Sequence, residues 1–139
     1  MSDPSAQKTI LIVSGGVEAA DAAKRAREMG LYVIVSDRDP HAPGFAHADS
    51  VLLADVYSPK ETAAAAERFS RKLRKIDGVI CVAADAPMTV AAVNARLGLP
   101  GISEESAKLA SDKLSMKERF LAAGVPIPWF SAVSTPQML

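Results

Sequence analysis

The chain has 139 residues, which suits one domain, and its 16 basic and 16 acidic residues give a formal net charge of zero. With no long basic run, this balance argues against nucleic acid as a partner. The single cysteine excludes a disulfide framework and a cysteine cluster for metal. Because 49% of the residues are hydrophobic and only 5% aromatic, the core has to be built from small and aliphatic side chains.

The sequence gives no sign of a membrane partner. No apolar run reaches the roughly 18 residues that a membrane span needs. The first eight residues, which we expect to form a disordered tail, are polar and lack the hydrophobic stretch of a signal peptide. We therefore expect a cytoplasmic location.

The first half of the chain predicts three strands and one helix. Residues 9–13 are a short apolar run, typical of a strand buried on both faces. Alanines spaced by three and four predict a helix after Ser14-Gly15-Gly16, and Gly30 is a suitable left-handed end for it. Residues 31–37 and 50–54 predict the second and third strands. A strand, helix and strand this close together require a right-handed crossover and a parallel pair.

The second half continues the alternation. Ser58 is placed to cap a helix, with Pro59 at its first position and Glu61 closing a capping box. Residues 79–82 predict a fourth strand and residues 88–97 another helix, and a short capped helix follows over 103–110. The order predicts an α/β fold, a Rossmann-like, open, doubly wound parallel sheet of four to five strands with flanking helices.

A glycine-rich turn stands where an open parallel sheet binds ligands, at the carboxyl end of a strand. Backbone N–H groups of Ser14-Gly15-Gly16 and the dipole of the following helix favour an anion there. Three interpretations remain open: a tight turn that needs glycine, an anion site for a small substrate, and a dinucleotide site. Asp37 stands where a ribose-binding acid would, but Ser14 and Ala19 occupy two glycine positions of the dinucleotide pattern.

Other polar residues point less clearly to a site. Asp85 follows the fourth strand, where it either caps the next helix or accepts a hydrogen bond from a substrate hydroxyl or amine. His41 and His47 lack a cysteine partner and helical spacing, so we expect surface residues and no metal site. Cys81 is expected to be an inert core residue in mid-strand. Basic residues crowd the end of the second helix, where they align with its dipole: Arg68, Arg71, Lys72, Arg74 and Lys75.

The last helix carries a lysine at an unusual position. If Ser111 or Asp112 caps this helix, Lys113 lies in its first turn, where the helix dipole disfavours a cation. Lys113 is then either an exposed lysine or the partner of an anionic ligand that also contacts the helix N–H groups. Gly124 ends the helix, and residues 125–128 (Val-Pro-Ile-Pro) predict an extended segment that begins a strand.

These residues resemble a known family. The junction between the N-terminal and ATP-binding domains of ATP-grasp enzymes is similar in order and spacing to Leu99-Pro100-Gly101-Ile102-Ser103, Ser111-Asp112-Lys113, Met116-Lys117 and Ala123-Gly124-Val125-Pro126-Ile127-Pro128. That family includes carbamoyl-phosphate synthase large chains, biotin carboxylases and purine-pathway ligases. The Gly15-Gly16 turn and Asp37-Arg38-Asp39-Pro40 resemble its N-terminal domain.

The resemblance implies a preATP-grasp domain over residues 9–110, after a tail over 1–8. Residues 111–139 would be the junction helix and first strand leading into an ATP-grasp domain that the sequence lacks. The parent would be a carboxylate–amine ligase that uses ATP and Mg²⁺ to form an acyl phosphate, which an amine or similar nucleophile attacks. We expect the 139-residue chain to be inactive by itself.

The resemblance also assigns residues. Lys113 matches a lysine that contacts ATP in relatives, and Gly15, Gly16, Glu18 and Asp85 match the substrate side. No catalytic residue and no Mg²⁺ ligand is expected within this chain, because both would lie in the missing domain. The expected partners are ATP and a small carboxylate substrate.

Two alternatives stay open at this point. The chain could be a free-standing Rossmann-like module that binds NAD, ATP or a small anion at its glycine turn. It could also be an interaction domain, a homodimer formed through the aromatic pair Trp129-Phe130.

Overall fold

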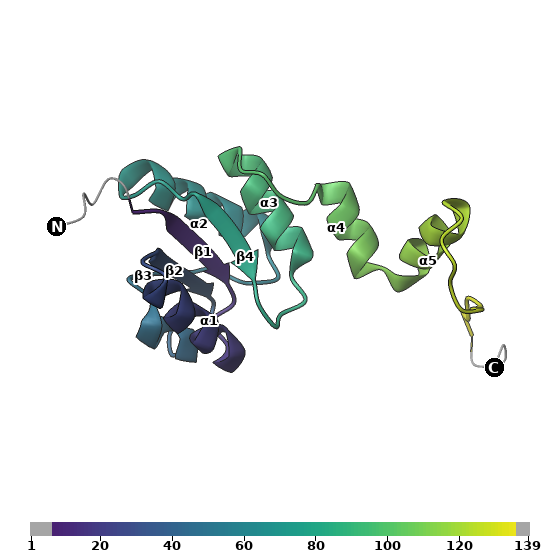
Figure 1. Cartoon of the computed structure of the whole chain (residues 1–139), viewed down its shortest axis with the longest axis horizontal. Helices are drawn as coiled ribbons and strands as arrows, with labels where there is room; N and C mark the ends of the chain where they lie inside the picture. The colour runs from purple at the N-terminus through teal and green to yellow at the C-terminus, as the bar shows by residue number, and fades with distance from the viewer. Residues whose placement is uncertain (1–6, 136–139) are drawn as a thin grey trace.

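A computed structural model describes residues 7–135 and has a four-stranded parallel sheet at its centre (Figure 1). The strands lie in the order β3-β2-β1-β4, and their bounds are β1 (Thr9–Val13), β2 (Tyr32–Asp37), β3 (Ser50–Leu53) and β4 (Gly78–Cys81). Each strand lies within a residue or two of its predicted position. The predicted Rossmann-like α/β fold is therefore confirmed, at four strands.

Helices cover both faces of the sheet. Their bounds are α1 (Val17–Glu28), the 3₁₀ helix η1 (Pro43–His47), α2 (Pro59–Lys72), α3 (Pro87–Leu97), α4 (Glu104–Ser111) and α5 (Lys113–Ala122). Successive side chains of a strand point to opposite faces. Leu11 and Ile34 consequently pack on the side of α2 and α3, whereas Ile12, Val33 and Val35 pack against α1. The strands read as continuous apolar runs because both faces are buried.

Several helix ends follow the sequence. Gly98 ends α3 with φ +65°, and Gly124 follows α5 with φ +72°, a conformation that glycine adopts without strain. Ser103 caps α4 by accepting a hydrogen bond from the Ser106 N–H, and Asp112 caps α5. These caps depend on nearest neighbours in the chain, which is why the sequence predicts them.

The predicted capping box of α2 is wrong. Pro59 does occupy the first turn, but the Ser58 side chain makes no capping hydrogen bond, and its backbone (φ −110°, ψ 89°) is not in the usual extended conformation of a cap. Asp55 orders this turn instead, because its carboxylate accepts a bond from the Tyr57 N–H and its carbonyl accepts one from the Ser58 N–H. Helix α2 ends at Lys72, so Leu73 lies beyond it and is 75% exposed.

Helices α4 and α5 extend away from the sheet (Figure 1). Ala107 of α4 is fully buried, and α4 packs on α3, but α5 buries no residue and packs on α4. Within residues 125–135 no strand forms, and Trp129 is 89% exposed. A strand needs a neighbour to hydrogen-bond with, so the expected first strand after α5 is not seen in this chain. Whether this aromatic end supports a homodimer stays a prediction.

Asp77 joins the amino-terminal ends of β1 and β4. Its carboxylate accepts a hydrogen bond from the Thr9 N–H at 3.0 Å, and its own N–H donates to the Thr9 carbonyl at 2.9 Å. Lys8 and Lys75 lie 3.5 Å and 3.7 Å from the same carboxylate. The Thr9 hydrogen bond is the main cause that lowers the pKa of Asp77, with smaller help from these lysines.

A lowered pKa in the folded state makes stability depend on pH. The carboxylate contributes its stabilisation above the ordinary Asp pKa of about 3.9 and loses it as pH falls below that value. Asp77→Asn exchanges a charged acceptor for a neutral one, so we expect it to lower the free energy of unfolding by about 1 kcal/mol at pH 7. Urea denaturation between pH 7 and pH 3 should show this difference shrinking below about pH 4.

The exposed Asp21→Asn variant controls for loss of one negative charge. A difference between wild type and Asp77→Asn that stays constant over the whole pH range would contradict the assignment.

Candidate functional site

The loops at the carboxyl ends of the strands meet at one edge of the sheet. Val13, the last residue of β1, pairs with Ser36 of β2 on one side and with Cys81 of β4 on the other. β2 and then β3 lie on one side of β1 in the sheet, and β4 lies on the other side. The crevice between β1 and β4 is therefore the topological switch point, where open α/β sheets bind ligands.

Asp37 fixes the turn after β1. One of its carboxylate oxygens accepts a hydrogen bond from the Gly15 N–H at 2.8 Å, and the other accepts one from the Asp39 N–H at 3.0 Å. Ser14 itself donates to the Ser36 carbonyl and has φ +84°, which is unusual for a residue other than glycine. Asp37 thus serves the turn structurally, where a dinucleotide site would use it for a ribose.

Gly15 is required by close packing. A side-chain carbon on Gly15 would lie 2.8 Å from Cβ of Ala42, and the Gly15 carbonyl already accepts a bond from the Gly44 N–H at 2.7 Å. Both backbone polar groups of Gly15 are therefore used within the protein, and the residue shapes the turn. Gly16 is different, because a carbon added there would lie 3.7 Å from the nearest side chains, those of Ser14 and Glu18.

The start of α1 is open to a ligand. Gly16 occupies the cap position, and among residues 7–135 no side chain accepts a hydrogen bond from the first turn. The unpaired N–H groups and the positive end of the helix dipole favour an anionic group there. Glu18 lies in this first turn with an exposed side chain, where its carboxylate can accept hydrogen bonds from a hydroxyl or amine.

The loop after β4 faces the same edge. Ala83 has φ +60°, so both neighbouring loops contain a non-glycine residue in the left-handed region, a strain of order 1–3 kcal/mol each that is typical of functional sites. Asp85 is exposed and does not cap α3, whose cap residue is Ala86. Within the described chain its carboxylate accepts no hydrogen bond, which leaves it available to a ligand.

Cys81 lies at the end of β4 and not in mid-strand as expected. Its thiol donates to the Ala84 carbonyl at 3.2 Å, and burial is the main cause that raises its pKa. A raised pKa keeps the thiol neutral and poorly nucleophilic.

A small pocket of about 220 Å³ opens beside this turn and contains residues that the sequence did not single out as a site. It is lined by Ser14, Asp37, Arg38, Asp55, Val56 and Tyr57. The Arg38 guanidinium lies 3.7 Å from the Asp55 carboxylate, and both side chains are partly exposed. In the sequence, Arg38 and Asp55 follow the second and third predicted strands. That position indicates a shared pocket only once β2 and β3 are known to be neighbours.

Lys113 does not join this edge. It is the first residue of α5, exposed, and α5 packs on α4 (Figure 1). Asp112 before it accepts bonds from the Leu114 and Ser115 N–H groups and from the Ser115 hydroxyl at 2.7 Å. The hydrogen bonds from Ser115 lower the pKa of Asp112. The structure therefore brings together Gly16, Glu18 and Asp85 at the sheet edge and places Lys113 elsewhere.

The described residues form neither a metal site nor a membrane-spanning helix. No group of three or more His, Cys, Asp or Glu side chains is placed to hold a metal ion within residues 7–135. No helix in that part of the chain is long and apolar enough to cross a bilayer.

The strand order, the glycine turn and the uncapped helix define a Rossmann-like domain with its site at the switch point. The model of the ATP-grasp N-terminal domain family matches residues 23–101, more than half of the chain. This chain belongs to that family, and its sheet is the preATP-grasp fold. No curated protein sequence gives a significant match.

Solved structures agree with the family. Phosphoribosylglycinamide synthetase from Anaerococcus prevotii is 28% identical, with a TM-score of 0.72 over 85% of this chain and 29% of its own. L-amino acid ligase from Bacillus licheniformis is 16% identical (TM-score 0.74, 96% of this chain and 34% of that chain). N5-carboxyaminoimidazole synthetase from Staphylococcus aureus, a complex with ADP, is 20% identical (TM-score 0.65, 86% and 31%). The last two show similarity of fold alone, and this chain spans about a third of each structure.

The two glycines of the turn should differ sharply when each is replaced by alanine. Gly15→Ala places a methyl group against Ala42, so we expect a loss of about 1–3 kcal/mol in the free energy of unfolding, as for an overpacked core. Gly16→Ala meets no close neighbour and should cost less, about 0.5 kcal/mol, because alanine is a poorer cap residue than glycine. Chemical denaturation measures both, and equal effects would show that the Ala42 contact is not restrictive.

Proposed function

We propose that this chain is the substrate-side domain of an ATP-dependent ligase that activates a carboxylate as an acyl phosphate for attack by an amine or similar nucleophile. Family membership supports the ligase class. The observation that supports the substrate-side role is that the uncapped start of α1 and the exposed Asp85 follow neighbouring strands, β1 and β4, at the switch point of the sheet. We further propose that the protein works in the cytoplasm.

The site divides into complementary parts. The first-turn N–H groups after Gly16 would hold the anionic part of the substrate, since they are donors at the positive end of α1. Glu18 and Asp85 would accept hydrogen bonds from substrate hydroxyl or amine groups. Gly15 would act indirectly, by letting the turn pack against Ala42. Together these groups would orient the substrate, which lowers the entropic cost of the reaction.

Lys113 is proposed to contact the phosphates of ATP. It stands exposed at the first position of α5, where its ammonium group would attract an anion, whereas the helix N–H groups of Leu114 and Ser115 already donate to Asp112. ATP would supply the phosphoryl group that converts the carboxylate into an acyl phosphate, and phosphate would leave when the nucleophile attacks the acyl carbon. The described residues do not form a carboxylate cluster for Mg²⁺, so this ion would need ligands from outside them.

We propose residues 9–110 as the preATP-grasp domain and residues 111–139 as the junction to an ATP-grasp domain outside this chain. Without that domain the chain should not turn over ATP by itself. The exposed α5, which buries no residue here, supports this division because it leaves a helix surface to be covered. Reading the gene beyond codon 139 tests it: absence of an ATP-grasp domain there and in neighbouring genes would refute it.

Lys113→Ala should raise KM for ATP about 10-fold in the protein that includes the ATP-grasp domain, because a charge-assisted contact to phosphate is lost. Lys108→Ala, an exposed lysine on the preceding helix, is the matched control and should leave KM for ATP unchanged. Steady-state kinetics with varied ATP measures both. An unchanged KM in Lys113→Ala would remove this lysine from the nucleotide site.

Asp85→Asn and Glu18→Gln should instead affect the other substrates. Each removes a charged acceptor, so we expect KM for the carboxylate or amine substrate to rise about 10-fold or more, with KM for ATP unchanged. Glu28→Gln, at the far end of α1, is the control. If both site variants behave like this control, the carboxyl edge does not bind substrate.

A further inference from the structure

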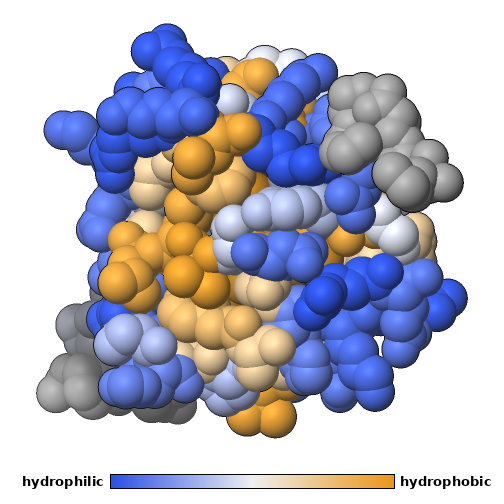
Figure 2. Space-filling view, turned by 90° about the vertical axis from the view of Figure 1, so that its left-hand side faces the viewer, coloured by the Kyte–Doolittle hydropathy of each residue, from blue (hydrophilic) through white to orange (hydrophobic). Residues whose placement is uncertain are grey.

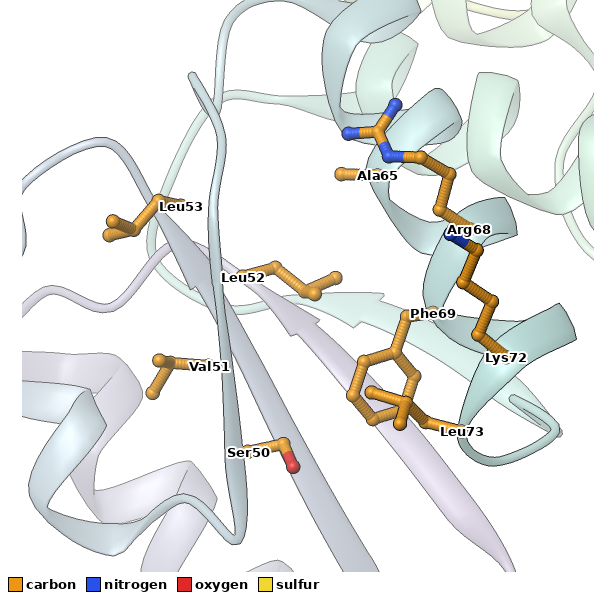
Figure 3. A pocket seen from close by; sticks show the side chains of 9 residues that line it. All are labelled: Ser50, Val51, Leu52, Leu53, Ala65, Arg68, Phe69, Lys72 and Leu73. Carbon is orange, nitrogen blue, oxygen red and sulfur yellow. The ribbon is translucent and has the colours of Figure 1, made fainter.

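A groove lies between the edge strand β3 and helix α2, away from the candidate site. It has a volume of about 530 Å³ and is lined by Ser50, Val51, Leu52, Leu53, Ala65, Arg68, Phe69, Lys72 and Leu73. Figure 3 shows Leu52 pointing toward Phe69 across the groove, while Val51 and Leu53 point to the opposite side of the strand. The floor is thus apolar, and one wall is the free edge of a strand.

The edge of β3 is unprotected. This strand pairs with β2 on one side, and no other described strand pairs with its outer edge. Val51 and Leu53 are 47% and 62% exposed, and the four residues of the strand include neither a charge nor a proline. Natural proteins usually protect such an edge with charge, proline or a covering segment.

Hydrophobic side chains gather on this face of the molecule. Figure 2, which looks at the side of Figure 1 that carries β3, shows a band of hydrophobic surface bordered by hydrophilic side chains. Leu73, 75% exposed at the end of α2, extends the apolar surface of β3. An apolar patch with a polar border is typical of a site of interaction.

Charge indicates what the groove binds. Arg68 and Lys72 are exposed along its wall, and none of the residues that line it is acidic. Their neighbours Arg71 and Lys75 form ion pairs with Glu67 and Asp77. By contrast, neither Arg68 nor Lys72 forms an ion pair with any residue in the described range. Two cations without partners beside an apolar floor complement a segment that carries both carboxylates and apolar side chains.

A second copy of the chain fits this charge pattern poorly. Two copies pairing their β3 edges around a two-fold axis would bring the same surface patch of each copy together. Arg68 and Lys72 of both copies would then share one interface without an acidic residue of the groove to balance them. Repulsion between like charges disfavours that dimer and favours an acidic partner.

The groove is also separate from the ligand edge. Ser50 begins β3 and Leu73 follows the end of α2, so this end of the groove lies at the amino-terminal ends of the strands, opposite to Gly16 and Asp85. The last described residues lie at the other end of the molecule from β3 (Figure 1). A segment bound here therefore leaves the candidate site accessible.

We propose that the edge of β3 and its groove against α2 bind an extended, acidic segment of a partner protein. The segment adds a strand beside β3, so its backbone pairs with the free edge. The side chains of the segment that point to the α2 side are apolar where they meet Leu52 and Phe69, and acidic where they approach Arg68 and Lys72. This interaction surface is independent of the ligase proposal, because none of its residues lies in the candidate site.

The test uses the 139-residue chain and a fluorescein-labelled peptide of about seven residues, to match a short strand. Every second position, on the face turned to α2, carries valine and glutamate in turn, and the positions between them carry threonine. A second peptide carries lysine in place of each glutamate, and a third carries serine in place of each valine. Fluorescence anisotropy should show saturable binding of the first peptide alone. Amide chemical shifts should change at residues 50–53 and along α2.

Variants then separate charge from edge pairing. Arg68→Glu combined with Lys72→Glu should weaken binding of the acidic peptide at least 10-fold, and Leu53→Pro should abolish it by removing an N–H donor from the free edge without changing the charge. Lys24→Glu, an exposed lysine on α1, is the matched control and should bind like wild type. Circular dichroism confirms that each variant is folded.

Four results would overturn the proposal. They are no binding at any accessible peptide concentration, equal binding of the acidic and lysine peptides, shift changes confined to other surfaces, and a dimer in sedimentation equilibrium that Leu53→Pro dissociates. The last result would assign the edge to self-association.

Discussion

The hydrogen bond from the Gly15 N–H to the Asp37 carboxylate determines how the ligand edge is built. It joins the end of β1 to the end of β2, and the Gly44 N–H holds the Gly15 carbonyl from the other side. With both ends of Gly15 fixed, Ser14 is held in a left-handed conformation and α1 begins without a side-chain cap. The free N–H groups at the start of α1 are thus a consequence of how the turn is packed.

Packing of the sheet and the site at its edge depend on the same central strand. β1 is buried on both faces and has a strand on either side, so its position is strongly determined. The loop that follows its carboxyl end therefore starts from a well-fixed position, which suits a site that has to orient a substrate. β3 has one neighbour and an exposed outer edge, and it carries the groove that we assign to a partner.

The sequence predicted the parts of this structure that depend on local chemistry. Continuous apolar runs identified four strands, Gly30 and Gly124 marked helix ends, and a cap at Ser111 or Asp112 placed Lys113 in the first turn of α5. The α2 capping box failed, since Asp55 competes for the same turn. Such competition depends on the three-dimensional path of the chain.

Other features depended on contacts between distant segments. The need for glycine at position 15 arises from Ala42, and the sequence could suggest only that a turn requires glycine. The pocket of Arg38, Asp55 and Tyr57 forms because β2 and β3 are neighbours. Asp85 could not be assigned between capping and ligand binding until Ala86 was seen in the cap position.

The single residue between α4 and α5 has a mechanical consequence. Asp112 is both the C-cap of α4 and the N-cap of α5, so its φ and ψ angles set the direction of α5 relative to α4. A swing of about 30° would carry the far end of this roughly 15 Å helix through about 8 Å. Lys113 stands next to the pivot and would hardly move. α4, anchored through Ala107, therefore fixes the location of the ammonium group, while the segment from Gly124 onward is free to follow the orientation of α5.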